Sequence, residues 1–179
     1  VSAPYGRHER SGWGPTIPSR LGWTVMEFPA PACFLWWYLE GPNASAPVSL
    51  VCLSLWLCHY LHRTFIFPFR ARLEGKRMPA VVAALAIAFN ILNAYINSHW
   101  VSHFAAFDNA WFFDPRFIIG LSLFCFGMWL NISSDNRLMA LRKPGETCYR
   151  IPRGGGFEHV SAPNYLGEFI EWCGWAMLT

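Results

Sequence analysis

The stretch APVSLVCLSLWLCHYLHRTFIFPF, residues 46–69, decides the fold, because it is apolar over most of its length and long enough to cross a membrane as a helix. Its second half contains HYLHRTF, residues 59–65, which brings ionisable and hydrogen-bonding side chains into the apolar run. An arginine near the middle of a membrane helix costs roughly 2.5 to 3.5 kcal/mol on insertion scales. The sequence therefore predicts that Arg63 has a buried partner, a polar cavity or water beside it.

The composition of the chain is typical of a membrane protein. Hydrophobic residues make up 54% of the 179 residues and charged residues 14%, against about 25% charged residues in an average soluble domain. A soluble protein with a large core is the alternative, but the apolar runs are too long and too closely spaced for ordinary core helices. The net charge of +3 is small and scattered, which argues against nucleic-acid binding. The six cysteines form no CxxC pair and indicate neither a disulfide framework nor a zinc site.

Four further apolar segments accompany the opening stretch, and together they predict an all-α, polytopic transmembrane helical bundle. We treat residues 1–179 as a single membrane-embedded domain, because no repeat or low-complexity tract interrupts the set of spans. The chain begins at Val1 without a methionine and ends at Thr179 inside an apolar segment, so we expect the protein to continue past both ends. The five expected spans lie at about 21–39, 46–69, 79–107, 115–130 and from 164 onward.

Two of these spans contain residues that predict local features. Pro29 and Pro31 should kink the first span and free backbone carbonyls. The third span carries three asparagines at spacings of three and four, which places their amides on one helix face. These are Asn90, Asn93 and Asn97.

The Lys and Arg residues are concentrated in three of the predicted loops. If the spans alternate in direction, loops 1–20, 70–77 and 136–163 share one side of the membrane, and they hold twelve of the fourteen Lys and Arg residues. The positive-inside rule then places these three loops in the cytosol. The exceptions are Arg63, inside a span, and Arg116, on the opposite side.

Glu27 and Tyr60 form the first candidate site. A carboxyl in a membrane segment is a functional hypothesis by default, because desolvation favours its protonated form and makes it a hydrogen-bond or proton donor near neutral pH. A tyrosine hydroxyl can donate to a developing oxyanion. Together the two groups could hold a carbonyl oxygen in a dry cavity. The residues alone leave open the alternative that Glu27 pairs with Arg63 for stability and that Tyr60 makes a core contact.

A polar belt in the cytosolic loop and the adjoining spans is the second candidate site. Amides, carboxylates and arginines suit a large ligand with phosphates and riboses, because arginine binds phosphate bidentately and carboxylates accept from ribose hydroxyls. Several arginines favour a cofactor with a 2′-phosphate. The alternative is a basic loop with ordinary salt bridges, and Gly154–Gly156 is not a dinucleotide fingerprint because no strand surrounds it. The belt comprises Asn131, Asp135, Arg142, Lys143, Tyr149, Arg150, Arg153, Asn164 and Glu168.

The histidines do not predict a metal site. His99 and His103 stand at i and i+4, as zinc ligands do, but no adjacent glutamate or third ligand accompanies them. We expect His59 and His62 to serve as hydrogen-bond partners that line the cavity.

Several motifs, spread over nearly the whole chain, are similar to those of one family of membrane enzymes. The longest of them lies in the cytosolic loop and the start of the fifth span. The matching stretches are Trp23–Glu27 with Pro29, His59–Phe65, Asp114–Phe117, Asn131–Asp135, Leu141–Glu146, Tyr149–Gly155, Asn164–Glu168 and Glu171–Trp172. On these residues the chain resembles the steroid 5α-reductases, the 3-oxo-5α-steroid 4-dehydrogenases.

The resemblance implies a helical membrane enzyme of seven spans, five of which lie in this sequence. It implies reduction of the Δ4 double bond of a 3-oxo steroid with NADPH, with hydride passing to C5 and a proton to C4. By the same resemblance, Glu27 and Tyr60 hold the 3-oxo oxygen, and Trp23 and Phe89 match walls of the steroid pocket. The positions that match the NADPH site are Tyr5, Asn131, Asp135, Arg142, Tyr149, Arg150, Asn164 and Glu168.

The resemblance also predicts location and partners. Loop 136–163 becomes a cytosolic cofactor-binding loop, in the endoplasmic reticulum membrane of a eukaryote or the inner membrane of a bacterium. We expect a steroid or steroid-like lipid as substrate and no obligate protein partner. The alternatives are a reductase of another lipid enone or enoyl group, of the polyprenol or enoyl thioester type, and a non-catalytic sterol-binding membrane protein. A membrane methyltransferase is a further alternative, against which the arginine-rich belt argues.

Overall fold

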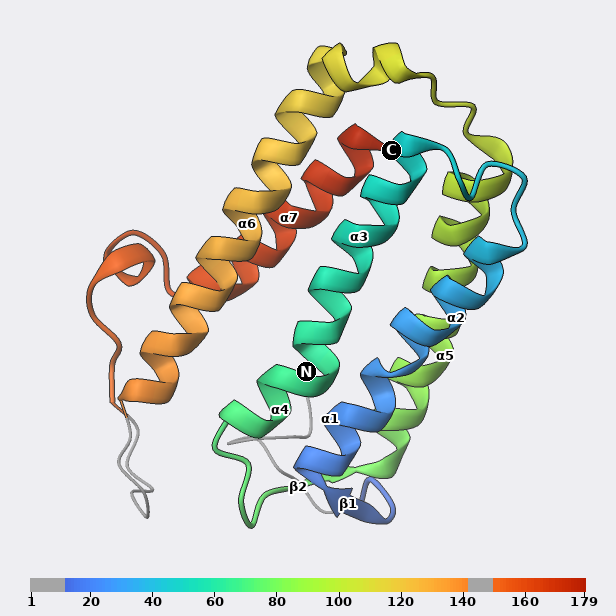
Figure 1. The fold of residues 1–179 in the computed structure, drawn as a ribbon. Coiled ribbons are helices and arrows are strands. Elements are labelled where there is room, and N and C mark those ends of the chain that lie inside the picture. Colours follow the sequence, from blue (N-terminus) through green and yellow to red (C-terminus); the bar gives the residue numbers. More distant parts are fainter. Residues whose placement is uncertain (1–11, 142–149) are drawn as a thin grey trace. The chain divides into compact units, whose positions relative to one another are not determined.

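The computed structural model describes residues 12–141 and 150–179, and Figure 1 shows them as a ribbon. They form two compact units, one that ends at Asp108 and one that begins at Asn109, and each is described by itself. Helices dominate both units, and the described residues contain only two short strands, both in the first unit. The predicted all-α membrane fold is confirmed, and the single domain of residues 1–179 stays a prediction.

Three helices in the described ranges are long and apolar enough to cross a membrane, which supports an integral membrane protein. They are Pro47–Arg70, Ala80–Phe104 and Pro115–Ala140, and they coincide with the second, third and fourth predicted spans. The first predicted span is divided into two shorter helices. The helix of the fifth predicted span, α7 (Pro163–Leu178), has 16 residues.

The first predicted span is interrupted at its prolines, as expected. Helix α1 (Ser19–Glu27) is followed by α2 (Pro29–Leu39), with Phe28 between them. A proline has no backbone N–H, so Pro29 and Pro31 each leave a carbonyl of the preceding turn without its usual donor. Glu27 is therefore the last residue of α1 before the break.

The helix of the opening stretch changes pitch among its polar residues. Helix α3 (Pro47–Leu61) continues as the π-helix η2 (His62–Ile66) and then as α4 (Phe67–Arg70). A π-helical turn inside an α-helix is rare and is frequent at functional sites. The change of pitch follows Tyr60 and places Arg63 in the π-helical turn.

Helix α5 (Ala80–His99) is the packing partner of the two helices of the first predicted span. It contacts both α1 and α2 and continues as a second π-helix, η3 (Trp100–Phe104). Figure 1 shows α5 beside α1 and α2. This packing brings the amide-bearing helix next to Glu27.

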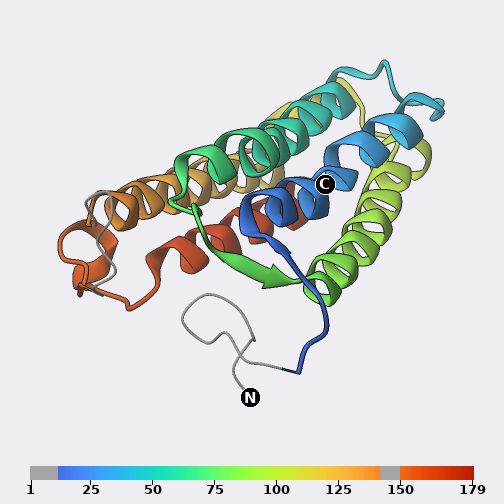
Figure 2. The same ribbon diagram turned by 90° about the horizontal axis from the view of Figure 1, so that it is seen from below.

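A short antiparallel ribbon joins the starts of α1 and α5. Strand β1 (Thr16–Pro18) pairs with β2 (Arg77–Pro79), and Ile17 stands opposite Met78. Figure 2 shows this ribbon at the start of both helices. Met78 is buried and packs against Met26 of α1, so the ribbon closes the end of the first unit.

The second unit consists mainly of two long helices that lie side by side (Figure 1). A Cβ atom added at Gly127 would lie 2.4 Å from the backbone nitrogen of Glu171, and one added at Gly167 would lie 2.5 Å from that of Asn131. Small residues are the usual way for membrane helices to approach this closely, because lipid offers little hydrophobic drive for helix association. The elements of this unit are η4 (Asn109–Phe113), α6 (Pro115–Ala140), η5 (Gly155–Glu158) and α7.

Helix α6 extends well past the predicted end of its span near residue 130. Its last part, NISSDNRLMA, contains neither glycine nor proline, so nothing in the local sequence stops the helix. Asn131 and Asp135 consequently lie one helical turn apart on the same face, and both are buried.

Asp114 caps the start of α6. Its Oδ1 accepts a hydrogen bond from the backbone N–H of Arg116 at 2.8 Å, and the Arg116 guanidinium donates to both carboxylate oxygens at 2.9 Å. The guanidinium bonds, followed by the backbone bond, lower the pKa of the Asp114 carboxyl to about 2.

Candidate active site

The carboxylate of Glu27 is the centre of the polar groups in the first unit. Glu27 is 9% exposed, and its Oε1 lies 3.8 Å from Nη2 of Arg63. Its Oε2 accepts from Nδ2 of Asn90 at 3.4 Å, and the same Asn90 nitrogen donates to the Met26 carbonyl at 2.7 Å. The buried partner that the sequence predicted for Arg63 is therefore Glu27.

Two aromatic rings also surround the Arg63 guanidinium. Its Cζ lies 5.0 Å from the ring centroids of both Trp23 and Phe67, and these rings meet edge to face with centroids 5.1 Å apart. Cation–π attraction reaches about 2 kcal/mol or more when the cation is desolvated. Because the Arg63 side chain is only 12% exposed, the two rings offset part of the cost of burying its charge.

Tyr60 lies on the last turn of α3 with its ring buried. Its ring contacts Trp56 at 4.7 Å and meets His59 edge to face at 4.8 Å. Its hydroxyl oxygen accepts a hydrogen bond from Nδ2 of Asn93 at 3.0 Å. Tyr60 therefore makes the core contact of the alternative interpretation and also receives a polar contact at its hydroxyl.

The three asparagines of α5 share one face, as predicted. Asn90 contacts Glu27 on α1, and Asn93 contacts Tyr60 on α3. Nδ2 of Asn97 donates to both the side-chain and the backbone oxygen of Asn93, each at 2.9 Å. One helix therefore contributes a polar contact to each of the two candidate catalytic residues.

This arrangement could act on a carbonyl oxygen. A carboxyl and a hydroxyl shielded from water interact strongly with negative charge that develops on a bound oxygen, and held groups need no reorganisation during the reaction. Glu27 and Tyr60 are held by neighbours on other helices, which satisfies this requirement. Their catalytic role stays a prediction.

The two predicted substrate residues have different environments. Trp23 is half-buried and lies against Arg63 and Phe67, so it belongs to the same polar and aromatic cluster as Glu27. Phe89 is 65% exposed, although its neighbour Asn90 is buried. The structure therefore connects Trp23 with Glu27 and places Phe89 on the exposed face of α5.

The predicted cofactor belt is partly assembled in the second unit. Nδ2 of Asn131 donates to the Asn164 carbonyl at 2.9 Å, and Nδ2 of Asn164 donates to Oδ1 of Asp135 at 3.1 Å. These bonds tie α6 to the first turn of α7. Two amides and a carboxylate from different parts of the chain thus meet in one place.

The remaining belt residues are more dispersed. Glu168 is half-buried one turn further along α7, and Arg150 is exposed. Arg153 is exposed, with Nη1 4.0 Å from Oε2 of Glu158. Tyr5, Arg142, Lys143 and Tyr149 lie outside the described residues.

The histidine pair of the third predicted span remains close in space. The rings of His99 and His103 stack with centroids 4.6 Å apart. Within residues 12–141 and 150–179, no three His, Cys, Asp or Glu side chains gather as a metal site would require.

Comparison with known proteins identifies the family. A family model described as 3-oxo-5-alpha-steroid 4-dehydrogenase matches residues 76–179. Steroid 5-alpha-reductase DET2 of Arabidopsis thaliana is 48% identical over 186 residues, which cover 100% of this chain and 71% of the relative. The chain belongs to the 3-oxo-5-alpha-steroid 4-dehydrogenase family. The protein named 3-oxo-5-alpha-steroid 4-dehydrogenase 1 of Homo sapiens is 44% identical over 179 residues, which cover 99% of this chain and 69% of the relative.

In this 3-oxo-5-alpha-steroid 4-dehydrogenase family member, Arg137 is a further candidate for the polar belt, because its guanidinium lies beside the glycine run. Gly154 and Gly155 have φ values of 83° and 58°, which favour glycine. A Cβ atom on Gly155 would lie 2.9 Å from Nε of Arg137, so these glycines let the backbone approach the guanidinium. The glycine run itself was the only signal, and it did not indicate which arginine lies beside it.

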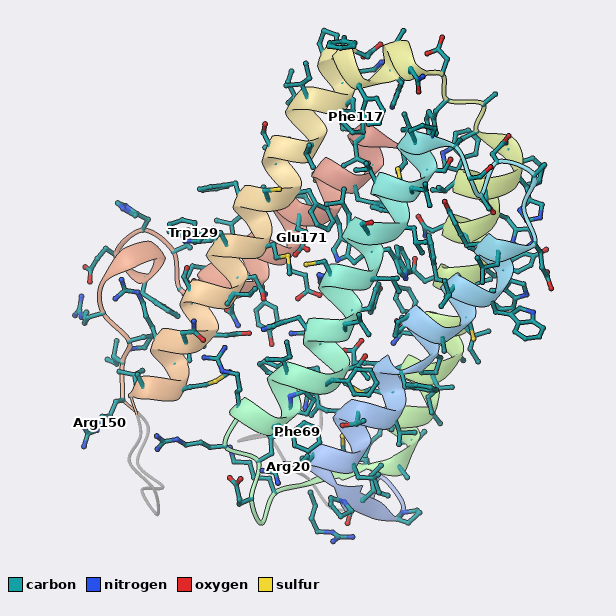
Figure 3. The ribbon with its side chains drawn as sticks, viewed as in Figure 1. Arg20, Phe69, Phe117, Trp129, Arg150 and Glu171 are labelled. Atoms are coloured by element: carbon teal, nitrogen blue, oxygen red, sulfur yellow. The ribbon has the colours of Figure 1, made fainter. Side chains whose placement is uncertain are left out.

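Glu171 is a second residue that received no role from its sequence position. It is fully buried on α7, where Figure 3 labels it, and Gly127 of α6 approaches its backbone. Glu168, one turn earlier on the same helix, is half-buried, whereas Glu171 is fully buried. The close approach of the glycine-bearing helices accounts for this difference.

Proposed function

We propose that this protein is an NADPH-dependent 3-oxo-5α-steroid 4-dehydrogenase, which reduces the Δ4 double bond of 3-oxo steroids to give 5α-reduced 3-oxo steroids. The names of its relatives support this activity. One observation in the structure carries the proposal. A buried carboxyl, Glu27, and a buried hydroxyl, Tyr60, both accept hydrogen bonds from amides on one face of α5.

Glu27 and Tyr60 would act at the 3-oxo oxygen of the steroid. Tyr60 donates a hydrogen bond to this oxygen, and Glu27 can do the same once the carboxylate that faces Arg63 has taken up a proton. Withdrawal of electrons toward the oxygen makes C5, at the far end of the conjugated enone, electrophilic. Trp23, which packs beside Arg63, and Phe89 are the proposed apolar walls for the rings of the steroid.

The cofactor residues fit a nicotinamide dinucleotide by their chemistry. Asn131, Asp135 and Asn164 present amides and a carboxylate, which suit the hydroxyls and amide of such a molecule. Arginine can bind phosphate, and the described residues contribute Arg137 and Arg150, while the resemblance adds residues outside the described ranges. The proposed cofactor residues are Tyr5, Asn131, Asp135, Arg142, Tyr149, Arg150, Asn164 and Glu168, with Arg137 as an addition.

The reaction balances with one NADPH and one proton for each double bond. When bound, NADPH supplies the hydride that adds to C5. The negative charge that reaches the 3-oxo oxygen is stabilised there by Tyr60 and Glu27 until a proton adds to C4.

The basic loops support a cytosolic cofactor site. The positive-inside rule places loop 136–163 in the cytosol, where NADPH is available. We propose the endoplasmic reticulum membrane for a eukaryotic protein and the inner membrane for a bacterial one.

The deciding experiment is NADPH oxidation by the purified protein in detergent with testosterone or progesterone as substrate. Tyr60→Phe should lower kcat by about 100-fold to 1,000-fold, the range for loss of one donor to an oxyanion, and Glu27→Gln should also lower it. Ser54→Ala is the control, because the Ser54 hydroxyl is exposed and only donates to the Leu50 carbonyl of its own helix. Wild-type rates in both site variants would exclude the proposed chemistry. Turnover of enoyl thioesters or polyprenols without steroid turnover would support another lipid reductase instead.

A further inference from the structure

The Tyr60 hydroxyl has a neighbour for which no role has been assigned. Nδ2 of Asn93 donates to the Tyr60 hydroxyl oxygen at 3.0 Å, and Oδ1 of Asn93 accepts from Nδ2 of Asn97 at 2.9 Å. From this chain of contacts we infer that Asn93 is a positioning residue for the Tyr60 hydroxyl and that Asn97 sets the orientation of the Asn93 amide. The inference rests on the proposed function, in which Tyr60 donates to the 3-oxo oxygen.

Asn97 determines which end of the Asn93 amide faces Tyr60. An asparagine amide has an accepting oxygen at one end and a donating nitrogen at the other. The Asn97 amide is itself fixed, because its Nδ2 also donates to the Asn93 carbonyl at 2.9 Å. With its oxygen held by Asn97, Asn93 presents its nitrogen to the tyrosine. The spacing of four residues on α5 makes this arrangement possible.

The hydrogen bond from Asn93 determines the direction in which the Tyr60 hydroxyl can point its proton. A phenol oxygen that accepts a hydrogen bond from an amide cannot direct its own proton toward that amide. The proton is therefore directed to the other side of the hydroxyl, where it can donate to a substrate oxygen. A donor that is itself hydrogen-bonded is also polarised, which strengthens the bond that it donates. Trp56 and His59 contact the ring, and Asn93 contacts the hydroxyl oxygen itself.

A purely structural role for Asn93 makes a different prediction. Hydrogen bonds between membrane helices also stabilise packing, and Asn93 joins α5 to α3. If packing were its only role, replacing Asn93 would affect enzymes with and without the Tyr60 hydroxyl equally. If Asn93 acts through the hydroxyl, its replacement should matter only when the hydroxyl is present.

The test is a double-mutant cycle in the purified protein with NADPH and testosterone. Asn93→Leu should lower kcat about tenfold, the usual effect of one hydrogen bond, and should change the KM for steroid less. In the Tyr60→Phe background the same substitution should leave kcat unchanged. Asn97→Leu should lower kcat by a smaller factor, because Asn93 then keeps its position but loses its fixed orientation. This loss should also disappear in the Tyr60→Phe background. Ser54→Ala serves as the control on α3.

Asn93→Asp addresses the case in which Asn93→Leu does not fold. This variant keeps the shape of the side chain but replaces the donating nitrogen with an accepting oxygen. Tyr60 would then donate to the aspartate instead of the substrate, so kcat should fall at least as far as in Asn93→Leu. Thermal unfolding of each variant verifies that the proteins compared are folded.

Two outcomes overturn the inference, and they differ from each other. Equal losses of kcat from Asn93→Leu, or from Asn93→Asp, with and without the Tyr60 hydroxyl would show a structural role while leaving the proposed function intact. A Tyr60→Phe enzyme with the wild-type kcat would remove the proposed function and the inference with it.

Discussion

In the first unit the helices meet through buried polar and aromatic side chains, whereas in the second, beside the polar contacts of Asn131, Asp135 and Asn164, glycines bring the backbones of α6 and α7 together. Arg63 reaches Glu27 across helices, and Asn93 reaches Tyr60. Between α6 and α7, glycines remove the side chains from the contact, and Gly127 lies against the backbone of Glu171. A polar contact can hold a reactive group in place, whereas a glycine contact mainly sets the distance between two helices. This difference agrees with the proposal that the first unit supplies the groups that act on the substrate carbonyl.

The largest expected effect comes from breaking the buried ion pair of the first unit. Arg63→Leu should lower the free energy of unfolding by about 3 to 5 kcal/mol, because Glu27 then remains buried without its cation. The double variant Glu27→Leu with Arg63→Leu should lose less, since it leaves no unpaired charge. Unfolding in detergent measures both values. Arg116→Leu is the control in the second unit, because its pair with Asp114 is exposed, and a loss as large as that of Arg63→Leu would contradict the comparison.

Replacing one glycine with alanine in each unit tests the difference in helix packing between the two units. Gly127→Ala should lower the free energy of unfolding by about 1 to 3 kcal/mol, because the new Cβ would meet the Glu171 backbone at 2.4 Å and both helices must move. Gly22→Ala in the first unit is the matched variant. Its Cβ would meet the Met78 sulfur, which belongs to a flexible side chain that can shift, so the loss should be smaller. Equal losses of unfolding free energy in the two variants would show that close glycine contacts matter as much in the first unit as in the second.

Substitution of one asparagine in each unit should separate the two proposed binding roles. Asn164→Ala removes the hydrogen bond that holds Asp135 and should raise the KM for NADPH about tenfold while leaving the KM for steroid unchanged. Asn90→Ala, which removes a contact to Glu27, should act mainly on steroid. Steady-state kinetics with each substrate varied in turn gives both constants. If both variants raised the KM for the same substrate, the assignment of steroid binding to the first unit and NADPH binding to the second would be contradicted.

The smallest expected effect is a dependence of stability on acidic pH in the second unit. The pKa of Asp114 is lowered from 3.8 to about 2, so its contribution is fully present above pH 4. The contribution is lost as the pH falls through about 2, because the protonated carboxyl no longer binds the Arg116 guanidinium. Asp114→Asn keeps an N-cap and should remove this dependence. Unfolding midpoints between about pH 4 and pH 2 measure it, and identical pH profiles for the two proteins would exclude the contribution.

The first unit has a similar exposed pair that joins distant parts of the chain. Arg20 donates to Glu74, and its guanidinium lies 5.6 Å from the Phe69 ring. Figure 3 labels Arg20 and Phe69, which lie close together. The backbone hydrogen bond at Glu74, with help from Arg20, lowers the pKa of that carboxyl. Asp114 and Arg116, in contrast, are two residues apart. Both pairs therefore keep their carboxylates ionised. Of the two, the Arg20–Glu74 pair connects distant parts of the chain, whereas the Arg116–Asp114 pair is local.

Much of the candidate site followed from local sequence. The position of Arg63 within an apolar run predicted a buried partner, and the spacing of Asn90, Asn93 and Asn97 predicted a common face. Both predictions are confirmed. The prolines predicted the break that follows Glu27. These features depend on neighbours within one or two helical turns, which a sequence displays directly.

Other features could not be predicted in this way. The polar residues after residue 130 predict the end of the fourth span, but none of them breaks a helix, and α6 continues to Ala140. The contact between Arg137 and Gly155, and the burial of Glu171 against the glycine-bearing helix, join residues that are distant in the chain. Their partners depend on how each helix is rotated, and residue spacing carries no information about the rotation of one helix relative to another.

By itself, the sequence determined that the chain is an all-α membrane protein and that Arg63 needs a buried partner, because hydrophobic length and the cost of burying a charge are local properties. Only the tertiary structure decided that this partner is Glu27 and that Asn93 holds the Tyr60 hydroxyl. It also decided that α6 and α7 meet at their glycines. Contacts between helices depend on shape and rotation over the whole packed surface, and these are set only when the helices fold against one another.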